Sequence, residues 1–136
     1  MKLSTRTRYA ARALVEIARH RGNPVAVKGI SESQKISVKY LENLMKNLKK
    51  HDLVHSFRGV DGGYVLGRDA RQITMLDIYT AVEGEVEFVE CVNDPASCAI
   101  YDTCPTNCVW TGLSRVVREY LSSYTVHALL NNSSKE

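Results

Sequence analysis

Residues 37–66 read SVKYLENLMKNLKKHDLVHSFRGVDGGYVL, and this stretch predicts a helix followed directly by a small hairpin. Ser37 is a typical helix cap, and the helix is expected over 38–50 because apolar residues recur at helical spacing on one face. That apolar face is formed by Leu41, Leu44, Met45 and Leu48. The other face is polar and basic, so it is expected to remain in solvent.

The hairpin is predicted from two β-rich runs, 53–57 and 64–66, with RGVDGG between them. The Asp-Gly and Gly-Gly steps supply residues that adopt positive φ easily, which tight hairpin turns require. Arg58 is then expected near the tip of the hairpin. A hairpin that directly follows such a helix is typical of a wing beside a DNA-reading helix.

Upstream of this stretch, Ser4 is expected to cap a first amphipathic helix that ends at about Arg19. The segment Gly-Asn-Pro at 22–24 terminates it, and a short helix follows at about 28–33. A tight turn at 35–37 joins that short helix to the helix over 38–50. Two helices joined by a tight turn, with a basic second helix, predict a helix-turn-helix.

The polar face and the wing supply the predicted DNA-binding residues. Base-edge candidates are Ser37, Lys39 and Asn43, and phosphate contacts are expected from Lys46, Lys49 and Lys50. Arg58 is placed to enter a minor groove. Tyr40 and Glu42 are the remaining predicted DNA-binding residues. The alternative is an amphipathic surface helix and a hairpin with a solvated arginine.

Charge supports a polyanion partner for the first half of the chain. Residues 1–72 contain fifteen Lys and Arg against six Asp and Glu, whereas residues 73–136 contain three against nine. The 136 residues are 44% hydrophobic, which is enough for one hydrophobic core. No apolar run approaches the roughly 20 residues of a membrane span, and the amino terminus lacks a secretory signal, so a cytoplasmic protein is expected.

All four cysteines lie between positions 91 and 108, at Cys91, Cys98, Cys104 and Cys108. Thiols stay reduced in the cytosol, so clustered cysteines there favour metal binding or redox sensing over disulfides. The gaps of six, five and three residues lack the paired knuckles of a zinc ribbon, although zinc is still possible. No Lys or Arg lies between residues 72 and 114, which argues against a cation-activated free thiol. An iron–sulfur cluster suits the longer gaps better.

The second half of the chain is expected to contain two further helical segments. Residues 73–82 have helical spacing with Thr74 as a possible cap, and a continuous apolar stripe follows from a helix start near Pro105. The stripe consists of Val109, Leu113, Val116, Val117, Tyr120, Leu121 and Tyr124. It is broad enough to contact a partner chain as well as the protein's own core.

The predicted organisation is a DNA-binding domain over 1–82, a cysteine loop over 83–108, a dimerisation helix and C-terminal segment over 109–130, and a polar tail over 131–136. The fold class is mainly α with a small β-hairpin, a winged helix-turn-helix with a long C-terminal dimerisation helix. No nucleophile elbow, P-loop or acid pair is present, so the sequence does not indicate an enzyme.

The opening MKLSTRTRYA, the segment ISVKYLE at 36–42 and the wing RGVDGGYVLG at 58–67 resemble a family of bacterial winged-helix regulators. That family includes the iron–sulfur cluster assembly regulator (IscR), the nitric-oxide sensor NsrR and the cysteine-metabolism repressor CymR. The resemblance runs from Met1 to about Leu130. It implies a homodimer that binds a pseudo-palindromic operator on double-stranded DNA and represses cluster-assembly genes.

The resemblance also implies that Cys91, Cys98 and Cys104 are ligands of an iron–sulfur cluster, with a two-iron cluster preferred to a four-iron one. In the cluster assembly regulator the fourth ligand is a histidine, at the position that Asn107 occupies here. Cys108 is the preferred fourth ligand and Asn107 the alternative. If Cys104 were the N-cap residue of the following helix, Asn107 would lie on the same side of that helix as the Cys104 side chain. The nitric-oxide sensor uses an acidic residue of its first helix, which Arg8 replaces here.

The glutamate that matches Glu42 helps the cluster assembly regulator to select among operators, and the resemblance extends that role to Glu42. The alternatives keep the fold but change the signal to nitric oxide, redox state or cysteine metabolism. A rival from another class is a zinc-stabilised protein-interaction module that uses the acidic half.

Overall fold

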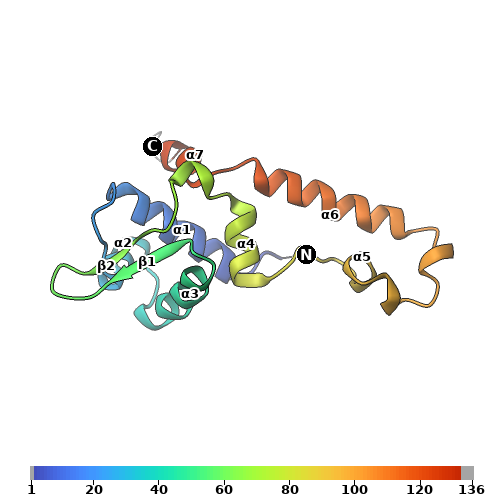
Figure 1. Cartoon of the computed structure of the whole chain (residues 1–136), viewed down its shortest axis with the longest axis horizontal. Coiled ribbons are helices and arrows are strands. Elements are labelled where there is room, and N and C mark those ends of the chain that lie inside the picture. The colour runs from blue at the N-terminus through green and yellow to red at the C-terminus, as the bar shows by residue number, and fades with distance from the viewer. Residues whose placement is uncertain (1, 133–136) are drawn as a thin grey trace.

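The computed structural model describes residues 2–132, which form a mostly helical structure with one two-stranded antiparallel hairpin (Figure 1). The elements are α1 (Thr5–Arg19), α2 (Val27–Gln34), α3 (Val38–Lys50), β1 (Val54–Phe57), β2 (Gly63–Leu66), α4 (Met75–Glu83), α5 (Glu90–Asn93), α6 (Asn107–Ser122) and α7 (Val126–Asn132). Short 3₁₀ turns occur at Ala70–Gln72, Pro95–Ser97 and Tyr101–Thr103. The predicted fold class is confirmed. No helix in the described part of the chain is both long and apolar enough to cross a membrane.

The helices begin where local hydrogen bonds stabilise them. The Ser4 hydroxyl accepts from the backbone N–H of Arg6, and the Ser37 hydroxyl accepts from that of Tyr40 at 3.2 Å. Thr74 and Asp77 form a reciprocal capping box at the start of α4. Three caps proposed from the sequence are therefore confirmed.

The turn between α2 and α3 depends on Lys35, which adopts the left-handed conformation with φ of 58°. This residue ends α2 and redirects the chain, and Ser37 then starts α3. The backbone N–H of Ile36 donates to the carbonyl of Ser31 at 3.3 Å, which closes the turn. The predicted helix-turn-helix is present.

The hydrophobic core is built around α1. Ala10, Ala13, Leu14 and Ile17 line the buried face of this helix, and α2, α3, β2, α4 and α7 all pack on it. The apolar face of α3 is buried as the sequence predicts, with Leu41, Leu44, Met45 and Leu48 each at most 2% exposed. Burial on that face leaves the polar face of α3 in solvent.

The hairpin pairs Val54 with Leu66 and Phe57 with Gly63. The wing is attached to the core by a backbone bridge between Val25 and Tyr64, in which Val25 N–H donates to Tyr64 at 2.9 Å and Tyr64 N–H donates back at 2.8 Å. Gly63 permits this approach, because a Cβ atom there would lie 2.4 Å from the Val25 carbonyl carbon. The attachment of the wing therefore requires a residue without a side chain.

The C-terminal segment departs from the predicted organisation. The long helix starts at Asn107, with Thr106 as its N-cap residue, close to the expected start near Pro105. It ends at Ser122, and α7 turns back onto α1, with Val126 fully buried in the core. Backbone bonds from Met75 N–H to Tyr124 and from Val126 N–H to Ile73, both at 2.9 Å, fix this return.

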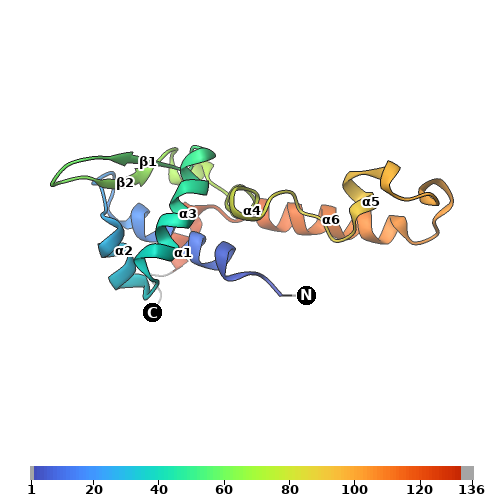
Figure 2. The same ribbon diagram turned by 90° about the horizontal axis from the view of Figure 1, so that it is seen from below.

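The predicted C-terminal segment 109–130 thus belongs partly to the first domain, because its last residues complete that core. Of the predicted tail 131–136, Asn131 and Asn132 belong to α7, and the remaining residues lie outside the described part. Figures 1 and 2 show α6 extending away from the globular part, with α5 and the cysteine loop beside its far end.

We expect Gly63→Ala to destabilise the protein by more than about 2 kcal/mol, because the new methyl group would collide with the Val25 backbone. The measurement is the midpoint of thermal or urea unfolding. Gly29→Ala is the matched control, since its Cβ would make only ordinary contact, at 3.8 Å from the Val25 side chain. Alanine in place of glycine within α2 should stabilise the protein by about 0.5–1 kcal/mol. Equal midpoints for Gly63→Ala and the wild type would refute the role given to Gly63.

Candidate DNA interface and cysteine loop

The exposed face of α3 carries most of the predicted DNA-binding residues. Lys39, Glu42, Asn43, Lys46, Lys49 and Lys50 are all exposed. Positions 39, 43, 46 and 50 form one stripe at helical spacing, opposite the buried leucines. The structure therefore presents a continuous polar and basic surface about three turns long.

Two of the predicted DNA-binding residues, Tyr40 and Ser37, also make contacts within the protein. The ring of Tyr40 packs edge-on against Tyr9, with centroids 5.7 Å apart, and its hydroxyl lies 3.0 Å from the Thr5 hydroxyl. Tyr40 is half-buried, so it holds the start of α3 against α1. The Ser37 hydroxyl caps the helix through Tyr40 N–H, and its own proton is still available to an external acceptor.

The wing lies beside α3 and is joined to it through Lys49, whose Nζ donates to the Ser56 hydroxyl at 2.8 Å. Arg58 is exposed at the start of the hairpin loop. Two apolar residues that the sequence reading did not select are also exposed there: Phe57 is 56% exposed and Val60 fully so. The sequence contained a sign of these two residues, because an apolar residue stands on each side of Arg58-Gly59, where a loop exposed to solvent usually has polar residues.

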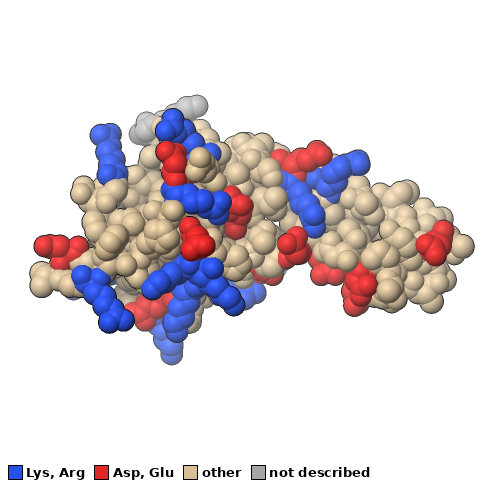
Figure 3. Space-filling model, in the orientation of Figure 1, with Lys and Arg blue, Asp and Glu red and all other residues tan. Residues whose placement is uncertain are grey.

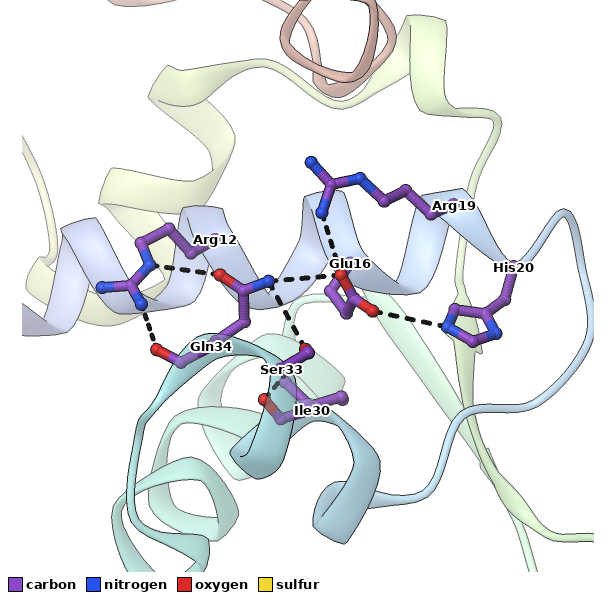
Figure 4. A network of polar contacts seen from close by, with 7 residues as sticks. All are labelled: Arg12, Glu16, Arg19, His20, Ile30, Ser33 and Gln34. Carbon is purple, nitrogen blue, oxygen red and sulfur yellow. Dashed lines mark hydrogen bonds and ion pairs between the residues drawn. The ribbon is translucent and has the colours of Figure 1, made fainter. Parts of the chain in front are cut away.

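A network of polar contacts fastens the helix-turn-helix to α1 (Figure 4). Arg12 donates through Nε to the Gln34 side chain at 3.2 Å and through Nη2 to the Gln34 carbonyl. The Gln34 amide donates to Glu16 at 3.2 Å, and Arg19 donates to the same carboxylate at 3.0 Å. Gln34 is the last residue of α2, so this network holds the turn that orients α3.

Glu16 is the acceptor at the centre of this network. Burial acts to raise the pKa of its carboxyl group, but hydrogen bonds from Arg19 and His20 outweigh that effect and lower the pKa from its ordinary value. Glu16 therefore stays ionised well below neutral pH. Its contribution to stability is present above the ordinary pKa of the carboxyl group and is lost as the pH falls through the lowered pKa.

Charge is unevenly distributed over the molecular surface. Figure 3 shows Lys and Arg side chains along the lower edge of the globular part, where α3 lies in Figure 1. Acidic side chains are spread along the half that contains α5 and α6. The sign of the potential on the α3 face suits a phosphate backbone.

The four cysteines are free thiols in the loop from α5 to the first turn of α6. Cys91, Cys98 and Cys104 are half-buried and Cys108 is exposed. In the described part of the chain, no three Cys, His, Asp or Glu side chains lie close enough together to hold a metal ion. The structure thus collects the thiols at one end of the molecule without closing them around a common centre.

The Cys104 thiol has an environment that favours its ionised form. Its sulfur lies 3.4 Å from the Thr106 hydroxyl, and hydrogen bonds from that hydroxyl, from Thr106 N–H and from Asn107 N–H lower the pKa of the thiol. The pKa of Cys104 is lowered by hydrogen bonds and not by a nearby cation, so the lack of Lys and Arg around the cysteines did not predict it. A thiolate is the form that binds iron or zinc.

Thr106, rather than Cys104, is the N-cap residue of α6, so the capping geometry considered for Cys104 does not occur. The Asn107 side-chain amide donates to the Tyr101 carbonyl at 2.9 Å and joins the 3₁₀ turn to the helix start. Cys108 has only a weak contact, from its sulfur to the Pro105 carbonyl at 3.9 Å. Asn107 has a structural contact, whereas Cys108 is free to bind a ligand.

Helix α6 leaves much of its apolar stripe exposed. Only Ser114 is buried among its residues, whereas Val109, Val116 and Tyr120 are 53%, 57% and 61% exposed. The helix packs against α4 and α5 on one side. Exposed apolar surface of this extent on one helix face is typical of an interface.

Comparison with known proteins identifies the family. Residues 3–132 match the Rrf2 family, described as iron-dependent transcriptional regulators. The chain belongs to the Rrf2 family. Among curated Rrf2-type relatives, the "HTH-type transcriptional regulator IscR" of Sodalis glossinidius is 41% identical over 133 residues, which cover 97% of this chain and 80% of the relative.

Solved structures agree with this assignment. The Rrf2 chain resembles CymR (YrzC), the global cysteine regulator of B. subtilis, with a TM-score of 0.78 and 34% identity over 97% of this chain and 98% of that one. It resembles T. potens IscR with the same TM-score and identity, over 98% of this chain and 88% of that one. The protein is a DNA-binding transcription regulator with a winged helix-turn-helix.

Proposed function

We propose that this Rrf2 protein is a homodimeric, cytoplasmic repressor of iron–sulfur cluster biogenesis genes, controlled by an iron–sulfur cluster on its cysteine loop. The observation that carries the proposal is the combination of a basic α3 face with four free thiols at the far end of α6. Relatives named IscR and the iron-dependent family description support it. The metal measurement below separates it from the zinc alternative, whereas the nitric-oxide, redox and cysteine-metabolism alternatives keep the fold and change the signal.

We propose that α3 enters the major groove, with Ser37, Lys39 and Asn43 at base edges and Lys46, Lys49 and Lys50 at phosphates. Glu42, which is exposed on the same face, accepts from cytosine and disfavours other bases. Tyr40 acts by holding the start of α3 against Tyr9. Arg58 enters the minor groove beside the wing, where negative potential attracts a guanidinium group.

Arg58→Ala should weaken binding to a pseudo-palindromic duplex by about tenfold and reduce the salt dependence by roughly one counterion per wing. Fluorescence anisotropy at several salt concentrations measures both quantities. Arg71→Ala is the control, because Arg71 pairs with Asp69 at 3.2 Å in a turn that packs on α7, away from α3. Identical affinities and salt slopes for Arg58→Ala and the wild type would rule out the wing contact.

The second copy of the chain is the proposed occupant of the exposed stripe on α6. The stripe residues are apolar, and α6 extends away from the chain's own core (Figures 1 and 2). Antiparallel packing of two such helices would cover both stripes in one closed interface. A twofold dimer would also place two α3 helices on the two half-sites of a palindrome.

Tyr120→Asp should dissociate the dimer, because a carboxylate would be buried against the partner helix without a counterion. The dimer dissociation constant should rise by at least about 100-fold. Sedimentation velocity at micromolar protein concentration measures this change. Ser122→Asp adds the same charge to an exposed position off the stripe and should leave the dimer intact; dissociation of both variants, or of neither, would contradict the proposed interface.

The donor set fits an iron–sulfur cluster, since Cys91, Cys98 and Cys104 are half-buried thiols and the Cys104 pKa is lowered. We propose Cys108 as fourth ligand, because the Asn107 amide is engaged with Tyr101. When bound, the cluster would cross-link the turns of the loop through its bonds to these cysteine thiolates. A two-iron cluster is preferred.

Anaerobically purified wild type should be coloured and contain about two irons per chain. Cys104→Ala should lose the colour, Cys108→Ala should alter the visible and paramagnetic-resonance spectra, and Asn107→Ala should retain the wild-type spectrum. Iron analysis and spectroscopy on the four proteins test these outcomes. A colourless protein with one zinc per chain would refute the cluster, and an altered spectrum in Asn107→Ala alone would assign the fourth ligand to Asn107.

A further inference from the structure

A surface pocket lies between α5 and α6. Its volume is about 320 Å³, and Val92 and Asn93 of α5 line it together with Thr111, Ser114, Arg115, Arg118 and Glu119 of α6. That volume is within the range of pockets that hold small molecules. None of the residues proposed to bind DNA or a cluster lines this pocket.

Ser114 gives the first sign of a missing ligand. Ser114 is only 3% exposed. In the described part of the chain, its hydroxyl oxygen is the one buried side-chain oxygen or nitrogen atom without a hydrogen-bond partner. A buried hydroxyl without a partner is unfavourable, and such groups usually bind water or a ligand. Ser114 is among the residues that line the pocket, so a bound molecule could satisfy its hydroxyl.

The charged groups of the pocket give the second sign. Arg115 and Arg118 are the two Lys or Arg side chains described after residue 72, in an otherwise acidic half, and both line this pocket. Glu119 also lines it, so the pocket has two guanidinium groups against one carboxylate. Arg118 Nη2 donates weakly to Glu85 and Asn93, at 3.4 Å each, which leaves its other N–H groups for a ligand. Guanidinium and hydroxyl donors together favour carboxylate or phosphate groups.

The pocket and the exposed apolar stripe lie on different faces of α6. At about 100° per residue, positions 111, 115 and 118 lie roughly opposite positions 109, 116 and 120. A partner helix on the stripe would therefore leave the pocket accessible.

We propose that this pocket binds a small oxyanion, a carboxylate- or phosphate-bearing molecule, through Ser114, Arg115 and Arg118. The ligand would sit against Val92 and Asn93, which follow Cys91 directly in α5. Asn93 is also held to the Val86 carbonyl at 3.3 Å, so a ligand would join α5, the linker after α4 and α6. Occupancy would then stabilise α5, where the cysteine loop begins.

Binding is measured on the full-length, anaerobically purified protein by isothermal titration calorimetry, with inorganic phosphate and succinate as separate probes at constant ionic strength. Phosphate presents one tetrahedral oxyanion, and succinate presents two planar carboxylates to two arginines. We expect saturable binding of at least one probe. Ser114→Ala and Arg118→Gln should each weaken it by about tenfold or more.

Ser122→Ala is the matched control, an exposed serine on the same helix, and should bind as the wild type does. Ser114→Ala removes a buried hydroxyl without a partner, so it should fold with an unchanged or higher unfolding midpoint. The absence of saturable binding for both probes, or equal binding by Ser114→Ala, would overturn the site. Amide hydrogen exchange over 90–93 should slow when the probe binds; unchanged exchange would overturn the effect on α5.

Discussion

Burial of the apolar face of α1 is the interaction on which most of the DNA-binding domain depends. Leu14 and Ile17 are almost completely buried, and a side chain of this size contributes about 1.5–3 kcal/mol when it leaves water. No single neighbour covers this face, so α2, α3, β2, α4 and α7 share it. The orientation of α3 follows, because its leucines must face α1 and its lysines must then face solvent.

The same arrangement separates the reading surface from the thiols. Helix α3 lies in the globular part, whereas the cysteine loop lies beside the far end of α6 (Figure 2). One path by which the loop can affect DNA binding runs through α6 and its contacts with α4. Glu83, the last residue of α4, also accepts from Arg6 and Thr7, so the end of that path is fixed to the start of α1.

The cysteine loop has little packing of its own. It contains one four-residue helix and two 3₁₀ turns, and no residue from 87 to 113 is buried. A segment with so few buried apolar contacts has little local stability. Its order therefore depends on side-chain bonds such as that from Asn107 to Tyr101, and bonds from the thiols to a bound group would add to them.

Periodicity and capping chemistry were sufficient to predict α1, α3, α4 and the wing, because Ser37, Thr74 and the buried leucines act through neighbours a few residues away. The DNA-binding and ligand residues are predictions from side-chain chemistry and resemblance. The sequence could not reveal the return of α7 to α1, the bridge from Val25 to Tyr64 or the unpartnered Ser114 hydroxyl. Those features depend on contacts between residues distant in the chain, which only the tertiary path of the backbone brings together.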